Sequence, residues 1–309
     1  MTKVADETAC ETARVGPRVN AAGRGPVAAA IAIAFVFLWA SAYVPSKVAS
    51  VESPPLWFLA ARFTAAGLIL AGIAAAFGRR PPTTVRGWLV ACALGILTNA
   101  LYLGLTYTAL RHLSSGMGAI VASTNPLVLA LLAPRFLGEK LTPLKIAGLA
   151  LGFGGVLAIT VARAGTGGAR PADVALAFGG VLAGVGSTLL FKRWAEGADL
   201  LVVNAIQLLA AGLAIAPVAL LVYGVPHVAP TRELAASFAY LVLVVSVGAS
   251  LLWFWLLSKG EASRVSAYYY LTPAFGLALS ALLLHEPVEA HDIVGLVAIA
   301  GGIALVQRS

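Results

Sequence analysis

Long apolar stretches alternate with short polar or Pro/Gly-rich breaks along almost the whole chain. A helix that crosses a membrane needs roughly 20 mostly apolar residues. Ten windows of the sequence meet this condition: 27–49, 56–77, 86–109, 113–134, 142–162, 172–193, 200–223, 234–257, 262–284 and 290–307. The loops between them are short, so the pattern predicts an all-α membrane protein with ten transmembrane helices and no soluble catalytic domain.

The second half of the chain repeats the first at a nearly constant spacing. Asn125-Pro126 recurs 147 residues later as Thr272-Pro273, whereas earlier in the halves the offset is 145, as between Lys47 and Lys192. Residues related by these offsets are called mates below. Duplication of a membrane bundle is typical of transporters.

Each half is expected to hold five helices, an odd number, so the second half must enter the membrane from the opposite side. The two five-helix repeats are therefore inverted, related by a pseudo-twofold axis in the membrane plane, around a central cavity. The expected organisation is a disordered cytoplasmic tail over residues 1–26, a first repeat over 27–163, a Gly-rich linker over 164–171 and a second repeat over 172–309.

Composition and charge support this assignment. The chain is 60% hydrophobic and 11% charged, whereas about a quarter of the residues in soluble domains are charged. With the N-terminus in the cytoplasm, fifteen of the 21 Lys and Arg residues fall on cytoplasmic segments and five fall outside, as the positive-inside rule describes. We expect both termini to be cytoplasmic and the protein to lie in a cell inner membrane. Its expected partners are a small-molecule substrate and the lipid bilayer, with no nucleic acid; a monomer would suffice.

Polar and aromatic residues within the apolar windows gather in the first, third, fourth, sixth, eighth and ninth helices, and the fifth and tenth have almost none. Rings with a few hydrogen-bonding groups suit a pocket for a neutral or zwitterionic organic molecule. Near helix ends, Trp and Tyr more often anchor the helix at the membrane interface. The candidate substrate-binding residues are Trp39, Tyr43, Asn99, Tyr102, Ser123, Asn125, Ser187, Trp253, Tyr268, Tyr270 and Thr272.

The expected pocket is chemically lopsided, because Gly184 and Thr188 stand at the mate positions of Trp39 and Tyr43. Arg62 joins the candidate substrate-binding residues as the clearly intramembrane charge, and its mate is Gln207. An intramembrane cation is costly without a partner. Arg62 could bind a substrate carboxylate; the alternatives are snorkelling toward water or pairing with backbone groups.

Three prolines inside the apolar windows predict interruptions: Pro45, Pro126 and Pro273. Proline lacks an N–H group and frees the carbonyl four residues before it. These positions are hinge candidates, with simple kinking as the alternative.

All thirteen acidic residues lie in tails, loops or helix ends. A carrier driven by ions through a buried carboxylate would place one at mid-membrane, so we expect a facilitator that needs no proton or sodium gradient. No His, Cys or carboxylate cluster has metal-ligand spacing, and no buried Ser–His pair suggests proteolysis. We predict no catalytic residue, metal or cofactor. A membrane enzyme remains a remote alternative, and a channel or receptor does not account for the inverted repeat.

The motifs that carry a family resemblance are Trp39-x-Ser41, Ala61-Arg62-Phe63, Asn125-Pro126, Leu137-Gly138-Glu139, Pro273 and His285-Glu286. Over roughly residues 27–307 the chain resembles the drug/metabolite transporter superfamily in its ten-helix EamA-type form. It is most similar there to bacterial aromatic amino-acid exporters. The resemblance implies export of small organic metabolites, such as aromatic amino acids, by alternating access. Export of drugs, nucleosides or other metabolites with proton coupling is the alternative.

Overall fold

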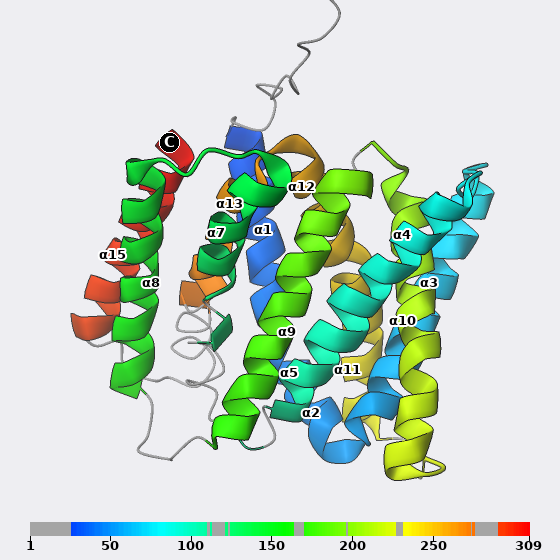
Figure 1. Cartoon of the computed structure of the whole chain (residues 1–309). Helices are drawn as coiled ribbons and strands as arrows, with labels where there is room; N and C mark the ends of the chain where they lie inside the picture. The colour runs from blue at the N-terminus through cyan, green and yellow to red at the C-terminus, as the bar shows by residue number, and fades with distance from the viewer. Residues whose placement is uncertain are drawn as a thin grey trace, which may run out of the picture.

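A computed structural model describes residues 26–109, 112, 121, 122, 124–163, 170–195, 197–226, 231–272, 274, 275 and 290–309, and the structural statements below concern these residues. The elements found there are all helical (Figure 1). η2, η3 and η4 are π-helical and η5 is a 3-10 turn. In chain order the elements are α1 (Pro26–Ser41), α2 (Tyr43–Glu52), α3 (Pro55–Ala76), α4 (Val85–Gly95), η2 (Ile96–Leu103), α5 (Gly104–Ala109), α7 (Asn125–Leu137), α8 (Pro143–Arg163), α9 (Pro171–Leu190), η3 (Phe191–Ala195), α10 (Leu200–Tyr223), α11 (Arg232–Tyr240), η4 (Leu241–Ala249), α12 (Ser250–Lys259), α13 (Ala262–Ala267), η5 (Tyr268–Leu271) and α15 (Ala290–Arg308).

Five continuous helical stretches are long and apolar enough to cross a membrane: Pro55–Ala76, Val85–Ala109, Pro171–Ala195, Leu200–Tyr223 and Arg232–Lys259. They coincide with the second, third, sixth, seventh and eighth expected helices. Shorter apolar helices cover Pro26–Ser41, Asn125–Leu137 and Pro143–Ala158. Parts of the expected fourth and ninth helices lie outside the described residues, so the count of ten stays a prediction.

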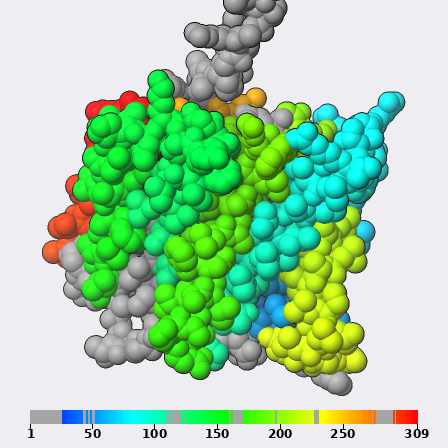
Figure 2. Space-filling view, viewed as in Figure 1, coloured from blue at the N-terminus to red at the C-terminus, as the bar shows by residue number. Residues whose placement is uncertain are grey.

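Large apolar side chains cover the outside of the bundle. Leu221 and Leu213 of α10 are 86% and 70% exposed, and Leu131 of α7 is 70% exposed. Figure 2 shows one such face, on which α8, α9, α4 and α10 lie at the surface. Soluble proteins rarely expose contiguous apolar surface on this scale, whereas a helix in lipid requires it. Together with the long apolar helices, this surface indicates a multi-pass membrane protein.

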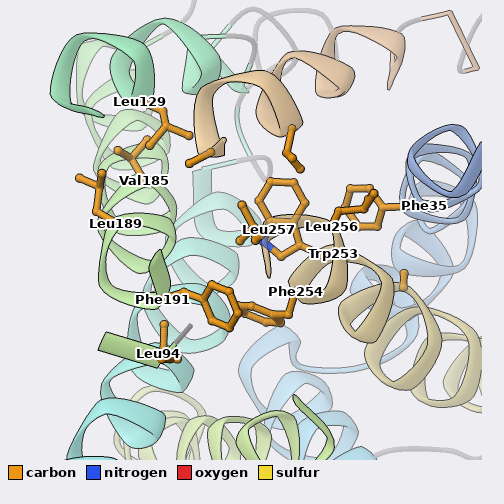
Figure 3. Close-up of a cluster of buried hydrophobic side chains, with 14 of the residues drawn as sticks. Phe35, Leu94, Leu129, Val185, Leu189, Phe191, Trp253, Phe254, Leu256 and Leu257 are labelled. Carbon is orange, nitrogen blue, oxygen red and sulfur yellow. The ribbon is translucent and has the colours of Figure 1, made fainter. Parts of the chain in front are cut away.

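The largest buried cluster lies between α1, α9, η3 and α12 (Figure 3). Phe35 of α1 and Phe191 of η3 are fully buried there, together with Phe254 of α12. The rings of Phe191 and Phe254 have centroids 4.8 Å apart. Leu94 of α4 and Leu129 of α7 also belong to this cluster. Since α1, α4 and α7 lie in the first half of the chain and α9, η3 and α12 in the second, this core joins the two halves.

The fifth and tenth expected helices, α8 and α15, lie side by side at one flank of the bundle (Figure 1) and pack through glycines. A Cβ atom added at Gly148 would lie 2.7 Å from the carbonyl oxygen of Gly302, and one at Gly155 would lie 2.6 Å from that of Gly295. Gly295 is the mate of Gly148, and Gly302 is the mate of Gly155. The duplication therefore relates the Gly148–Gly302 contact to the Gly155–Gly295 contact. Residue numbers rise along α8 as they fall along α15, so the helices are antiparallel. The axis that relates them is therefore perpendicular to both, as an inverted repeat requires.

The second and seventh expected helices, α3 and α10, pack with the same symmetry. A Cβ atom added at Gly67 would meet the side chain of Leu209, and one at Gly212 would meet that of Thr64. Gly67 and Gly212 are mates, as are Thr64 and Leu209. These two helices are also antiparallel. In two independent helix pairs, therefore, the packing contacts are related by the sequence repeat.

Candidate substrate-binding site

The first expected helix is interrupted. The sequence predicts one helix over residues 27–49, but α1 ends at Ser41 and α2 begins at Tyr43. Pro45 explains the position, because its ring clashes with the carbonyl of the residue four before it, which is Ser41. The Ser41 hydroxyl lies 2.6 Å from the Tyr240 hydroxyl of α11. The interruption is therefore joined to the second half of the chain.

Interruptions also occur at the mates Asn125 and Thr272. Helix α7 begins at Asn125 after a turn at Thr124, with Pro126 in the first helical turn. Proline is well accommodated in the first turn, where its missing N–H would have no partner. Thr272 follows the 3-10 turn η5, and its buried hydroxyl has no hydrogen-bond partner in the described part of the chain.

Tyr102 and Asn125 meet across α9. A Cβ atom added at Gly184 would lie 3.5 Å from the amide nitrogen of Asn125 and 3.6 Å from the ring of Tyr102. One turn earlier, a Cβ atom at Gly180 would be 3.6 Å from the same ring. The two glycines let neighbouring residues pack closely on α9, so the structure brings two predicted site residues from different helices together.

Hydroxyl and amide groups lie on neighbouring turns of the same helices. Ser187 of α9 is 3% exposed and hydrogen-bonds to Thr98 of η2. The next residue of η2, Asn99, is 8% exposed. No hydrogen bond joins its amide group to another side chain among the described residues. The buried hydroxyl without a partner in this region is therefore that of Thr272, within the part of the chain that the structure describes.

Four aromatic rings form a cluster between α1, α12 and η5. Trp253 stacks on Phe35 with centroids 5.3 Å apart, and Tyr269 lies 5.0 Å from Trp253. Trp39 completes the cluster at 5.9 Å from Phe35 and 6.3 Å from Tyr269. Figure 3 shows Phe35 and Trp253 side by side. Trp39 and Trp253 were expected in the site; Phe35 and Tyr269 were not.

The three consecutive tyrosines of η5 point to different neighbours. Tyr268 packs against the largest buried cluster and against the cluster around α8 and α15, whereas Tyr269 belongs to the aromatic cluster. Tyr270 is fully buried against Gly152 of α8 and donates a hydrogen bond of 3.3 Å to the Leu149 carbonyl. This is a packing position, so we do not carry Tyr270 forward as a substrate-binding residue.

Arg62 is buried, with 3% of its surface exposed, so it does not snorkel. Its Nε donates a hydrogen bond of 2.8 Å to the hydroxyl of Ser246 in η4. Tyr107 of α5 interacts electrostatically with the guanidinium, and its hydroxyl donates to Ser46 of α2. Arg62 is therefore the centre of a hydroxyl cluster formed by α2, α3, α5 and η4.

A second buried cation lies at the start of α8. Lys145 is 2% exposed, and its Nζ lies 3.1 Å from a carboxylate oxygen of Glu261 and 3.8 Å from one of Glu139. Glu139 also accepts hydrogen bonds from the backbone N–H groups of Ala262 and Ser263. The negative charge thus stabilises the N-terminus of α13, where backbone donors lack partners. Glu139 therefore connects the first half of the chain to a helix of the second half.

Three predicted residues are not placed. Ser123, Pro273 and the side chain of Tyr43 lie outside the described residues. Among those described, no three His, Cys, Asp or Glu side chains gather as metal ligands would.

Comparisons with known proteins give one consistent family. The sequence model of the EamA-like transporter family matches the chain twice, over residues 27–161 and 172–308. The chain is 30% identical over 286 residues to the uncharacterized transporter YvbV of Bacillus subtilis, covering 90% of this chain and 91% of that protein. It is 28% identical to protein PecM of Dickeya dadantii, over 87% and 89% of the two chains. The uncharacterized inner membrane transporter YedA of Escherichia coli is 25% identical, over 88% of each.

One solved crystal structure shares the fold, with a TM-score of 0.76 at 22% identity over 90% of this chain and 96% of the other. The exposed apolar helices, the tandem family match and the packing contacts related by the sequence repeat define a helical, multi-pass membrane transporter. The chain belongs to the EamA-like transporter family.

Proposed function

We propose that this transporter exports small organic metabolites from the cytoplasm by alternating access, with aromatic amino acids as the favoured class. The observation that carries the proposal is the cluster of Phe35, Trp39, Trp253 and Tyr269 at the junction of α1, α12 and η5. Aromatic faces stack on planar side chains. The amide and hydroxyl groups of Asn99, Asn125 and Thr272 would bind the polar end of such a molecule.

The proposed architecture is ten helices in two inverted five-helix repeats, with both termini cytoplasmic. The antiparallel mates in α8 with α15 and in α3 with α10 support the inversion. The described ends of the chain also lie at the same end of the bundle (Figure 1). In this architecture Pro45, Pro126 and Pro273 are the proposed hinges between two states of a central cavity.

The second candidate is export of planar drugs or nucleosides, because the same rings would stack on any flat molecule. The buried positive charge of Arg62 disfavours a cationic drug by repulsion at low dielectric. A nucleoside is not disfavoured in this way.

The test is counterflow in proteoliposomes with labelled phenylalanine, tryptophan, leucine, a nucleoside and a planar cationic drug. We expect phenylalanine and tryptophan to exchange fastest, with no requirement for a pH or sodium gradient. Exchange of the cationic drug alone would contradict the substrate assignment. Concentrative uptake that a protonophore abolishes would contradict the facilitator assignment.

A further inference from the structure

Hydroxyl groups surround the buried guanidinium of Arg62. Ser246 accepts from its Nε, Tyr107 interacts with it electrostatically, and Ser46 accepts a hydrogen bond from Tyr107. Among the described residues no Asp or Glu forms an ion pair with Arg62. Within the described part of the chain the positive charge is therefore stabilised by hydroxyl dipoles and by the Phe63 ring, whose centroid lies 5.4 Å from the guanidinium carbon, but no carboxylate neutralises it.

Such an arrangement is costly unless an anion completes it. A charged group that is moved from water into a protein interior without a partner of opposite charge loses on the order of several kcal/mol of solvation free energy, even after the protein relaxes around it. Arg62 cannot recover this loss at the membrane surface, because only 3% of its surface is exposed. A guanidinium also stays protonated under all ordinary conditions. An anionic partner that arrives with the substrate would supply the missing charge.

We propose that Arg62 binds the carboxylate of the transported molecule, so that the substrates are small organic molecules with one carboxylate group. The inference rests on the proposed transport function and specifies its substrate class. Ser246 holds Nε, which leaves the terminal nitrogens of the guanidinium to donate to both oxygens of a carboxylate. One cation matches one negative charge, whereas a doubly charged phosphate would need more. Ser246 and Tyr107 are positioning residues.

The test compares ligands that differ only in this charge. Dissociation constants of purified protein are measured for phenylalanine and phenylalaninamide, and for leucine and leucinamide. The wild type is expected to bind each carboxylate more tightly than its amide. Hydrogen bonds to charged groups contribute about 1.5–3 kcal/mol, so Arg62→Gln should weaken carboxylate binding by about 10- to 100-fold. Amide binding should change less than about threefold, since glutamine can still donate to Ser246.

Three variants serve as controls. Arg62→Lys keeps the charge without the two-pronged geometry and should recover part of the carboxylate preference. Ser246→Ala keeps the charge and should weaken carboxylate binding by less than Arg62→Gln does. Arg79→Gln removes an exposed arginine, 57% exposed, and should leave both ligand classes unchanged.

The outcomes separate the two proposals. Equal weakening of carboxylates and amides by Arg62→Gln would show that Arg62 acts on packing, and no weakening of either would show that it does not touch the substrate; both overturn the inference. A wild type that prefers amides, or binds no carboxylate, overturns it as well. Counterflow of neutral substrates in that case would leave transport intact. Absence of counterflow for every labelled compound would instead contradict the proposed function.

Discussion

Lys145 and Arg62 are both buried cations, 2% and 3% exposed, but their surroundings differ. Lys145 has carboxylate oxygens of Glu261 at 3.1 Å and Glu139 at 3.8 Å. Arg62 has the hydroxyl of Ser246 at 2.8 Å and no acidic partner in the described structure. The first charge is neutralised inside the protein and links α8 to α13; the second is solvated but remains open to an anion. Burial of a cation therefore says little about its role until its partners are known.

Neither cation is repeated in the duplicated chain. The mate of Lys145 is Asp292 and the mate of Arg62 is Gln207. The glycine contacts, by contrast, are related by the sequence repeat. The scaffold thus keeps the symmetry of the duplication, while the charged clusters give the two halves different roles.

The largest expected effect follows removal of the neutralised cation. Lys145→Ala removes the cation that lies between Glu139 and Glu261 and leaves Glu261 paired with Arg264 alone. Breaking a buried pair costs about 3–5 kcal/mol. The Glu261 side chain is still 24% exposed, which weakens the pair. We therefore expect the free energy of unfolding to fall by about 3 kcal/mol, the lower end of this range. Denaturant unfolding of the purified protein measures it. Lys140→Ala, which removes an exposed lysine nearby, should change stability very little. Similar losses in both variants would contradict the role assigned to Lys145.

The next effect concerns the close approach of α8 and α15. A Cβ atom at Gly155 would lie 2.6 Å from the Gly295 carbonyl oxygen, so Gly155→Ala forces the backbones apart. Overpacking of this kind costs about 1–3 kcal/mol. Gly154→Ala is the matched control, because nothing lies within 4 Å of the added atom. Unfolding curves of the two variants should differ clearly. If they coincide, the packing described for this helix pair is wrong.

The aromatic cluster gives an effect on transport. We test Trp39 of this cluster together with Tyr102, which lies beside α9. Trp39→Ala and Tyr102→Ala should each weaken transport, with a loss of substrate-binding free energy of about 1–3 kcal/mol per ring, the magnitude known for bases stacked on aromatic side chains. Initial rates of counterflow at several substrate concentrations measure this effect. Trp88→Ala, at a position 44% exposed, removes an indole outside the cluster and should transport normally. Normal transport in both test variants would show that Trp39 and Tyr102 serve only in packing and do not bind substrate.

The smallest expected effect concerns an exposed ion pair, which serves as a comparison for the buried pair of Lys145. Arg79 pairs with Asp199 at 3.4 Å, but the two side chains are 57% and 31% exposed. Exposed ion pairs contribute about 0–1 kcal/mol and are screened by salt. Arg79→Gln should therefore unfold within error of the wild type at moderate ionic strength. If Arg79→Gln lowered the free energy of unfolding as much as Lys145→Ala does, the exposure of an ion pair would not determine its contribution to stability.

Periodicity was sufficient to predict the five long apolar helices. A run of apolar residues specifies a helix locally, and the spacing of Gly148 from Gly295 records the duplication directly. The sequence also placed Arg62 within a membrane helix, but it left open whether its side chain is buried or reaches water. These properties depend on one helix and its immediate chemistry.

Partners brought together by tertiary packing were missed. Nothing local to Lys145 indicates Glu261, which lies 116 residues away. Ser246 and Tyr107 were not assigned to Arg62 for the same reason. Tyr268 and Tyr270 were predicted to bind substrate, but nothing in the sequence indicates that Tyr270 packs against Gly152 of α8. A 3-10 turn rotates about 120° per residue instead of 100°, so η5 sends the three tyrosines to other neighbours.

The most direct measurement of the central comparison is the thermal unfolding of Arg62→Gln beside Lys145→Gln, without substrate. If the charge of Arg62 is not neutralised within the protein, its removal relieves an unfavourable burial, and the melting temperature should equal or exceed that of the wild type. Lys145→Gln should melt at a lower temperature, because it removes the positive charge that lies between the carboxylates of Glu139 and Glu261. A fall for Arg62→Gln as large as that for Lys145→Gln would contradict the account, since it would show that Arg62 is already paired within the protein.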